Sequence, residues 1–294
     1  MGGGAGISRA ATLPPPMPAG TLYVVATPLG NLGDLTPRAA ELLRTVPVVA
    51  AEDTRRTRGL LTHLGASPRL LSFHAHSSAG RAESLLEILK GGRDVALVSD
   101  AGTPVVSDPG ASLVGIVREA GIPIVPIPGA SAVATAVSVS GFEGDRYLFL
   151  GFVPRKGPER QRLLTRAAQE EWPTVFFEAP NRLAGLLADL AELAGEDRKA
   201  TVARELTKIH EEIRTGTLGA LALYFAQAEP RGEITLVLAG TGVPEEPPDR
   251  TVEGGTLAQA LLAAGLSRRD VVEQLITRLG IARNEAYRMV MELQ

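Results

Sequence analysis

Short apolar runs rich in β-branched residues alternate, in the first half of the chain, with segments whose apolar residues recur at helical spacing. An apolar run of this length is typical of a strand buried on both faces of a sheet. Strands that alternate with helices form βαβ units. The predicted strands are residues 21–26, 48–51, 70–73, 95–98 and 122–127. The first half of the chain therefore predicts an α/β domain with a mostly parallel sheet.

The same alternation restarts at Tyr147, and the composition changes near residue 240. Residues 241–255 are rich in glycine, proline and charge, which is typical of a linker. Two or three short amphipathic helices are predicted between residues 257 and 293. Further strands are predicted at residues 147–153, 174–177, 201–203 and 232–239. The predicted organisation is a disordered leader at 1–20, α/β domains at 21–128 and 129–240, a linker at 241–255 and a small helical domain at 256–294.

Polar loops follow several of the predicted strands. Residues 95–98 lead into a turn at 99–104, and Ser107 or Asp108 is expected to cap the next helix. The loops at residues 27–31, 52–55 and 129–131 follow strands in the same way. Because the carboxyl ends of parallel strands meet at one edge of a sheet, where open α/β folds bind ligands, these loops predict a binding site. The alternative is a set of capped connections with no ligand.

Composition narrows the classes of protein and of site. The chain has 294 residues and no cysteine, which excludes disulfides, thiol nucleophiles and cysteine zinc sites. Its net charge of −3 argues against a strongly basic nucleic-acid binder, although local basic patches stay open. No apolar run reaches the ~20 residues that a membrane-spanning helix needs, and residues 1–20 lack the plan of a signal peptide. These features predict a cytoplasmic protein without membrane association.

Carboxylates at strand ends are the candidates for chemistry, and each has a plainer alternative. Glu52 and Asp53 can orient a hydroxyl group or pair with Arg55, or they can form only a capping cluster at a helix N-terminus. Glu178 and Glu205 follow predicted strands beside arginines, so they are active-site groups or ion pairs that hold loops. The phosphate-binding glycine patterns are absent, and no histidine spacing suits a metal. No metal is expected.

Basic residues gather in two segments. Arg55, Arg56 and Arg58 open a predicted helix, and Arg155 and Lys156 lie in a predicted loop. These side chains can bind RNA phosphates, or they can be no more than solvated surface. The helical tail is only faintly basic, so a nucleic-acid module and a dimerisation module both stay open for it.

Seven motifs in series resemble one family, the bacterial 16S ribosomal RNA (cytidine 2′-O) methyltransferases of the tetrapyrrole-methylase superfamily. The motifs are LYVVATPLGNLGD at 22–34, AEDTR at 51–55, SDAGTP at 99–104, SDPG at 107–110, PGASA at 128–132, FEAPNRL at 177–183 and ARELTKIHEE at 203–212. The resemblance spans roughly residues 21–240. The tail resembles the family's small helical C-terminal domain more weakly.

The resemblance implies two α/β domains that hold S-adenosylmethionine in the cleft between them, usually in a homodimer. It implies methyl transfer to the ribose 2′-hydroxyl of a decoding-centre cytidine, so that 16S ribosomal RNA in the small ribosomal subunit is the expected partner. The residues carried over to the cofactor pocket are Thr27, Pro28, Asp100, Gly102, Thr103, Ser131, Ala132, Glu178, Ala179, Arg204, Gly232, Ile234 and Thr235.

A ribose hydroxyl is a poor nucleophile, so the reaction gains from a side chain that accepts its proton. The candidates are Glu52, Asp53, Glu205 and Lys208, and their spacing does not choose among them. The lysine would first need a lowered pKa. Two alternatives stay open: a methylase of a small tetrapyrrole-like substrate, and a non-catalytic RNA-binding or assembly protein with the same fold.

Overall fold

The computed structural model describes residues 18–74, 79–143, 145–228, 230–242 and 250–293. The first 17 residues of the predicted leader and residues 243–249 of the predicted linker lie outside these ranges. Gly20, inside the predicted leader, donates its backbone N–H to the carbonyl of Leu89. The chain divides into two units, one up to Gly240 and one from Thr241 onward.

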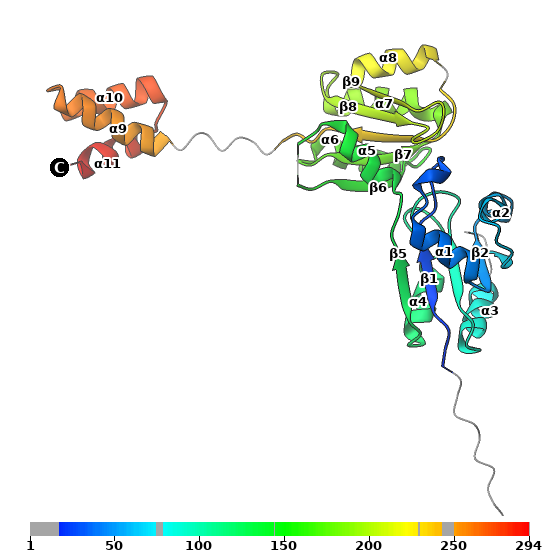
Figure 1. Ribbon diagram of the computed structural model, residues 1–294. Helices are drawn as coiled ribbons and strands as arrows, with labels where there is room; N and C mark the ends of the chain where they lie inside the picture. The colour runs from blue at the N-terminus through cyan, green and yellow to red at the C-terminus, as the bar shows by residue number, and fades with distance from the viewer. Residues whose placement is uncertain (1–17, 75–78, 144, 229, 243–249, 294) are drawn as a thin grey trace, which may run out of the picture. The chain divides into compact units, whose positions relative to one another are not determined.

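The first sheet is parallel throughout, with the strand order β3-β2-β4-β1-β5, which confirms the predicted α/β class (Figure 1). Its strands are β1 (Leu22–Val25), β2 (Val48–Ala51), β3 (Arg69–Ser72), β4 (Val95–Val98) and β5 (Ile124–Ile127). Its short helix and its covering helices are η1 (Leu32–Asp34), α1 (Pro37–Thr45), α2 (Thr54–His63), α3 (Ala79–Lys90) and α4 (Ala111–Glu119). Pro126 lies in β5, at the sheet edge, where proline removes no ladder hydrogen bond that the sheet needs.

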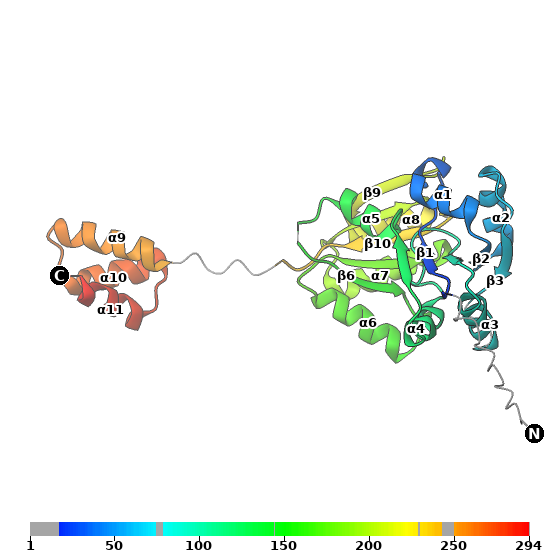
Figure 2. The same cartoon turned by 60° about the horizontal axis from the view of Figure 1, so that its bottom comes forward.

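Both faces of this sheet are covered, which explains its continuous apolar strands. Leu85 of α3 and Leu113 of α4 share one buried cluster with Leu97, whereas Leu43 of α1 packs in a second cluster with Val98. Since side chains alternate across a strand, every residue of β4 meets a helix on one face or the other. The turned view of Figure 2 shows α4 and α1 on different sides of the strands.

Helix starts follow the sequence in one case and depart from it in another. Thr36 caps α1, with its hydroxyl oxygen accepting from the N–H of Ala39 at 3.2 Å, as a threonine directly before a proline at the first helical position favours. The predicted cap of α4 by Ser107 or Asp108 is wrong, because α4 begins at Ala111 after Gly110. Ser107 has a left-handed backbone with φ 64°, which carries the chain away from a capping geometry.

The second sheet is mixed, with the order β6-β7-β10-β8-β9. Only β6 and β7 run parallel, and the other neighbours are antiparallel. Its strands are β6 (Leu148–Phe152), β7 (Thr174–Glu178), β8 (Lys199–Arg204), β9 (Glu212–Thr217) and β10 (Ile234–Leu238). Its helices are α5 (Ala132–Ser140), α6 (Pro158–Gln169), η2 (Pro180–Arg182), α7 (Leu183–Ala194) and α8 (Leu218–Ala228).

This sheet also has a helix on each face. Leu186 of α7 and Leu221 of α8 pack on one face with Leu236, and Ala136 of α5 packs on the other with Val237. Strand β9 was not predicted from the sequence, because it is an edge strand of mostly polar, exposed residues and has no apolar run.

The second unit is a three-helix bundle made of α9 (Arg250–Ala263), α10 (Arg268–Leu279) and α11 (Arg283–Glu292). Its core contains Ala258, Val271, Leu275 and Val290. Helix α9 begins at Arg250, inside the segment predicted as linker. Gly254, which favoured a linker in the sequence, lies within this helix, at a position where a Cβ would approach Met289 to 2.6 Å. Close packing therefore overrides the weak helix propensity of glycine.

Two neighbouring glycines of α9 provide a test of this packing. Gly255→Ala is expected to stabilise the bundle by about 1 kcal/mol, since alanine is the better helix former and its Cβ meets no atom within 4 Å. Gly254→Ala is expected to lose that gain or destabilise the bundle, because its Cβ would overlap Met289 and Ile281. Hydrogen exchange of residues 250–293 in the full chain measures both, and equal gains in the two variants would contradict the packing.

In the part of the chain that the structure describes, no helix combines the length and the apolar character that crossing a membrane requires.

Candidate functional site

The loops that follow β1, β2 and β4 are tied together at the carboxyl edge of the first sheet. Thr27 and Gly102 exchange backbone hydrogen bonds of 2.9 and 3.0 Å. The N–H of Asp53 donates to Oδ1 of Asp100 at 2.8 Å. Gly102 has φ 78°, a left-handed backbone that glycine adopts without strain. Three strand ends that are separate in the sequence therefore form one rigid rim, as the predicted loop clustering required.

This rim and the strand ends of the second sheet enclose a cavity of about 420 Å³, here named the large cavity. That volume is in the range of sites for small molecules and cofactors. The first α/β domain contributes Leu29, Glu52, Arg56, residues 100–103 and residues 106–108. The remaining lining residues are 131–133, Phe152, 177–180 and 232–235.

Most of the predicted cofactor residues line the large cavity: Asp100, Gly102, Thr103, Ser131, Ala132, Glu178, Ala179, Gly232, Ile234 and Thr235. Thr27 and Pro28 line a neighbouring cavity of about 230 Å³, here named the small cavity. Arg204 lines neither cavity. Its guanidinium instead donates to Glu212 at 3.0 Å and to the carbonyl of Arg231 at 3.3 Å.

The charged side chains that line the large cavity are mostly acidic. Five carboxylates and one cation face it, the cation being Arg56 and the carboxylates Glu52, Asp100, Asp108, Glu178 and Glu233. Burial, with repulsion from Asp108 and Asp100, raises the pKa of Glu52 above its ordinary value. Burial likewise raises the pKa of Asp108, and Asp100 and Glu233 add to this effect. Such crowding of negative charge favours a ligand that carries positive charge.

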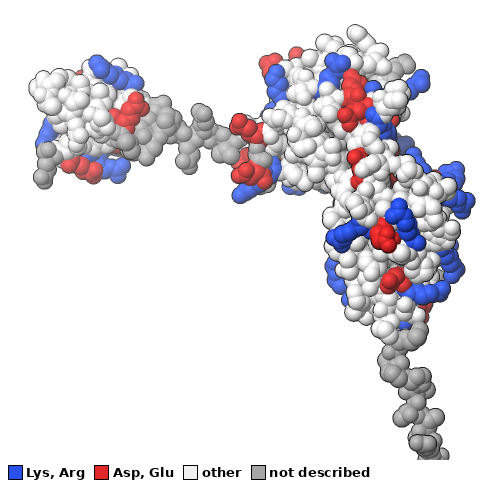
Figure 3. Space-filling model, viewed as in Figure 1, with Lys and Arg blue, Asp and Glu red and all other residues white. Residues whose placement is uncertain are grey.

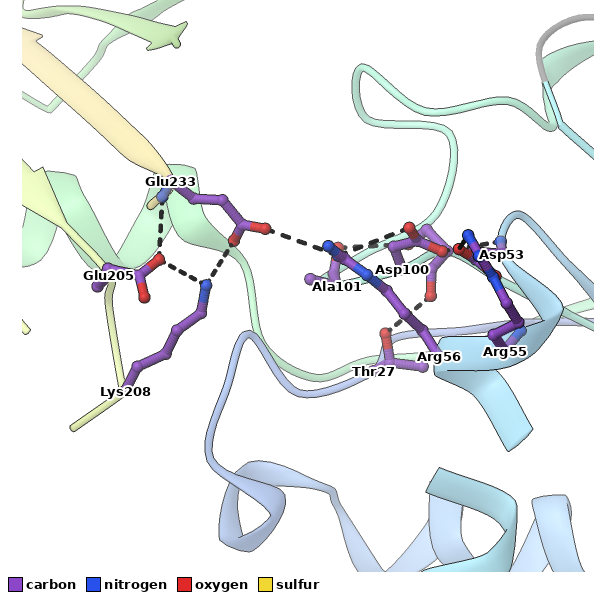
Figure 4. Close-up of polar contacts among 10 residues, drawn as sticks. Thr27, Asp53, Arg55, Arg56, Asp100, Ala101, Glu205, Lys208 and Glu233 are labelled. Carbon is purple, nitrogen blue, oxygen red and sulfur yellow. Dashed lines mark hydrogen bonds and ion pairs between the residues drawn. The ribbon is translucent and has the colours of Figure 1, made fainter. Parts of the chain in front are cut away.

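A chain of ion pairs crosses from the first sheet to the second beside this cavity (Figure 4). The Arg56 guanidinium lies 3.6 Å from Asp100 and 3.7 Å from Glu233. Lys208 donates to Glu233 at 3.1 Å and to Glu205 at 2.7 Å, and the Glu205 carboxylate also accepts from the N–H of Glu233. Arg56 thus connects both domains at the mouth of the cavity.

The four predicted proton acceptors lie in different surroundings. Glu52 lines the large cavity, whereas Asp53, Glu205 and Lys208 do not. Asp53 caps α2 by accepting from the N–H of Arg55, and hydrogen bonds from Arg55 lower the pKa of Asp53 to about 2. Burial acts to lower the pKa of Lys208, but its hydrogen bonds to Glu205 and Glu233 outweigh burial and raise it. Lys208 is therefore a cation held between two carboxylates.

Glu178 is a buried carboxylate at the end of β7. Its Oε1 accepts from the N–H of Ala179 at 2.8 Å. Its Oε2 lies 3.2 Å from the Arg182 guanidinium without hydrogen-bond alignment, and no described residue donates to it. Burial raises the pKa of Glu178. Glu178 is therefore held by Ala179 and Arg182 at the end of a strand that borders the cavity, with its carboxylate shielded from solvent.

Two lining carboxylates were not singled out in the sequence, Asp108 and Glu233. Glu233 directly precedes β10, and the antiparallel pairing of β10 with β7 brings it to the end of β7, where Glu178 lies. Asp108 was assigned to a helix cap, but its carboxylate forms a hydrogen bond with Ser99 and faces the cavity.

Strained backbone gathers around the same loops. Val105 and Ser107 have φ values of 74° and 64°, and Glu205 and Thr207 have values of 52° and 67°. Left-handed φ is costly for residues other than glycine, by about 1–3 kcal/mol each, and such strain concentrates at functional sites. The hydroxyl of Thr207 accepts from the N–H of Asn31 at 3.1 Å, so this strained segment contacts the first domain.

The predicted RNA-binding residues lie on two separate elements. Arg55, Arg56 and Arg58 occupy the first turns of α2, and Arg155 and Lys156 are exposed residues between β6 and α6. Only Arg56 lines the cavities. On the face that Figure 3 shows, basic and acidic side chains of the described residues are interspersed. No described group of three or more His, Asp or Glu side chains is arranged to hold a metal ion.

Comparisons with known proteins agree on one family. The profile of the Tetrapyrrole (Corrin/Porphyrin) Methylases matches residues 21–222. The chain is 46% identical to the ribosomal RNA small subunit methyltransferase I of Synechocystis sp. over 276 residues, which is 94% of this chain and 99% of that protein. It is 47% identical to the protein of that name from Thermotoga maritima over 221 residues, which is 75% of this chain and 99% of that protein.

Solved structures show the same fold at low sequence identity. Cobalt precorrin-4 methyltransferase is 18% identical with a TM-score of 0.59, over 74% of this chain and 94% of the other. Uroporphyrin-III-C-methyltransferase from Thermus thermophilus is 21% identical with a TM-score of 0.54, over 75% of this chain and 94% of the other. These structures support the arrangement of the two α/β domains.

Proposed function

The chain belongs to the tetrapyrrole methylase family, in the branch of the small-subunit ribosomal RNA methyltransferases I, and on this premise we propose that it methylates the ribose 2′-hydroxyl of a cytidine in 16S ribosomal RNA. It is an S-adenosylmethionine-dependent methyltransferase. The observation that carries the assignment to this site is the large cavity between the two sheets, with its excess of carboxylates. A ribosomal substrate would place the enzyme in the cytoplasm.

The residues of the large cavity fit this methyl donor. S-adenosylmethionine bears a positive sulfonium and an ammonium group, which the carboxylates Asp100 and Asp108 would stabilise. The buried Glu178 carboxylate, ion-paired with Arg182, adds negative charge beside the cavity. Phe152, Phe177 and Ile234 provide apolar wall for the flat adenine. No metal is assigned to the reaction.

When bound, the donor supplies a methyl group on sulfur: the bond from the ribose oxygen to the methyl carbon forms as the carbon–sulfur bond breaks, and its electron pair stays on sulfur. The chain must align the acceptor and take its proton. Glu52 accepts that proton, because it lines the cavity and its raised pKa makes it the stronger base. The low pKa of Asp53 and the ion pairs of Lys208 make these two weaker acceptors.

Side chains outside the cavity hold the RNA. Arg55 and Arg58 on α2, with Arg155 and Lys156 beyond β6, would pair with phosphates, which an acidic cavity itself repels. A homodimer is part of the proposal, since the exposed Ile213 of the edge strand β9 and the exposed Leu223 and Tyr224 of α8 offer apolar area for a second copy.

The test uses small ribosomal subunits from a strain that lacks this gene, and donor carrying a tritiated methyl group. We expect label in 16S ribosomal RNA at one cytidine, in a dinucleotide that resists alkali, because a methylated 2′-oxygen cannot attack the next phosphate. Label on the base would contradict the ribose assignment. Label in a porphyrinoid but not in RNA would favour a tetrapyrrole methylase. The absence of donor binding by calorimetry would favour a non-catalytic RNA-binding protein.

A further inference from the structure

The small cavity adjoins the large cavity and shares three lining residues with it, Leu29, Arg56 and Asp100. Its remaining lining comes from the loop after β1 and from α2, with Ser99 beside Asp100. None of the proposed donor contacts except Asp100 reaches it. A methyltransferase needs two ligands side by side, so a second cavity that shares part of its wall with the first has the place of an acceptor site.

The walls of the small cavity suit a flat heterocycle. Pro28, Leu29, Leu32 and Leu60 present apolar faces, and Leu32 is 45% exposed. The volume of about 230 Å³ is little more than half that of the large cavity. A single base taken out of its stack needs a pocket of this kind, with apolar surfaces for its faces and few polar groups for its edge.

We propose that the small cavity binds the cytosine base of the acceptor nucleotide and that Asp100 and Arg56 read its Watson–Crick edge. This inference rests on the proposed methylation of RNA and adds the site that selects the base. The edge of cytosine carries an amino donor beside a ring-nitrogen acceptor. Asp100 is an acceptor and Arg56 a donor, and the two lie 3.6 Å apart, so the pair offers the complementary order.

Both groups have hydrogen-bonding capacity to spare. Oδ1 of Asp100 accepts one backbone N–H, from Asp53, and a carboxylate has about four acceptor positions. The Arg56 side chain is 59% exposed and makes only two long ion pairs, so most of its five N–H donors have no described partner. Uracil presents an oxygen where cytosine presents its amino group, and that oxygen would face the Asp100 carboxylate. The pair therefore selects cytosine over uracil.

The position of Glu52 connects base binding to chemistry. Glu52 lines the large cavity close enough to Asp100 for the two carboxylates to repel each other, and Asp100 lines both cavities, so Glu52 lies near the boundary that they share. A nucleoside with its base in the small cavity extends its ribose across that boundary, toward the proposed proton acceptor. Gly30 packs so closely against Lys208 that a Cβ at position 30 would overlap the lysine side chain. The loop after β1 therefore contacts the second α/β domain at this point.

A glycine on α2 allows the small cavity to be filled without disturbing the large one. Gly59 lines only the small cavity and sits in a helix, with no atom within 4 Å of where its Cβ would lie. Gly59→Leu is expected to fold normally and to bind S-adenosylmethionine with wild-type affinity by calorimetry. Its methylation of the gene-deleted subunits is expected to fall by roughly tenfold to hundredfold in kcat/KM, since the base loses its pocket.

Gly185→Leu is the matched control. Gly185 is also an exposed helical glycine with open space around it, but it lines neither cavity. The Gly185→Leu variant is therefore expected to methylate the subunits at the wild-type rate. Wild-type methylation by Gly59→Leu would overturn the base site. If the wild-type chain itself labels no RNA, the proposed function fails instead, so the two failures are distinguishable.

A second arm tests the readout of the base. Subunits are reconstituted with 16S ribosomal RNA in which the mapped cytidine is changed to uridine, and the ratio of kcat/KM for cytidine over uridine is measured. Asp100→Asn is expected to lower that ratio roughly tenfold or more, because an amide can turn its N–H toward the uracil oxygen. The ratio is insensitive to changed donor binding, which affects both substrates equally. An unchanged ratio would contradict base reading by Asp100.

Discussion

Replacing Glu52 by glutamine is expected to lower the rate of methyl transfer by about 10²- to 10⁴-fold while S-adenosylmethionine still binds. Glutamine keeps the size and the hydrogen-bonding oxygen of glutamate but cannot accept the hydroxyl proton. Glu52 is the one predicted proton acceptor that lines the large cavity, and its raised pKa makes it a better base than an ordinary carboxylate. Single-turnover rates at saturating donor measure the chemical step directly.

The control for this variant is Glu41→Gln, the same change at an exposed carboxylate of α1 whose one ion pair is with Arg44. It should leave the rate unchanged. Asp53→Asn should lose far less activity than Glu52→Gln, because Asp53 is occupied by Arg55 and by the cap of α2. Equal losses in the Glu52 and Asp53 variants would show that the two carboxylates act together and would refute a single base.

The pH dependence of the methyl-transfer rate should also identify Glu52 as the proton acceptor. Because the folded-state pKa of Glu52 is raised above 4.5, the acid limb of the rate should rise with pH around a midpoint above that value. The folded chain also binds this proton more tightly than the unfolded chain, so Glu52 lowers the free energy of unfolding as pH rises through the same window. Glu52→Gln should remove both the kinetic limb and this loss of stability.

The strands of the first sheet were predicted well because each can be recognised from its own residues. A buried strand between two layers of helices must be apolar throughout, and residues 95–98 are. The loops after it carry polar residues and glycine, and parallel strands bring such loops to one edge without further information. This is why most residues predicted for the cofactor, from Asp100 to Thr235, line one cavity.

Long-range geometry escaped the sequence. Strand β9 is exposed and polar, and only its pairing with β8 makes it a strand. Asp53 and Glu52 are neighbours in the chain, and spacing cannot show that one caps a helix while the other faces a cavity. The sequence alone allowed Lys208 as a base, because it does not show that the lysine pairs with two carboxylates. One of them, Glu233, is 25 residues away in sequence. Gly254 suggested a linker because its packing partner lies on another helix.

Gly232→Ala, which adds one methyl group in the second α/β domain, is expected to destabilise the chain and to weaken donor binding. Gly232 has φ 88°, and a Cβ there would overlap the Glu205 carboxylate, which Lys208 and the N–H of Glu233 hold in place. Gly232→Ala is therefore expected to lower the free energy of unfolding by about 1–3 kcal/mol from backbone strain alone. Because Ile234 and Thr235 line the large cavity just beyond, the shift should also weaken donor binding by roughly tenfold, or ~1.4 kcal/mol.

Gly195→Ala separates the two effects. Gly195 has φ 92°, close to the φ of Gly232, but no atom lies within 4 Å of where its Cβ would be, and it lines neither cavity. Chemical denaturation should show a comparable loss of free energy of unfolding in both variants. Calorimetry with S-adenosylmethionine should show weaker binding only in Gly232→Ala. The overlap with Glu205, rather than the left-handed backbone, would then be what connects this glycine to the donor. Wild-type donor affinity in Gly232→Ala would mean that the Glu205–Lys208–Glu233 contacts can rearrange without moving the wall of the cavity.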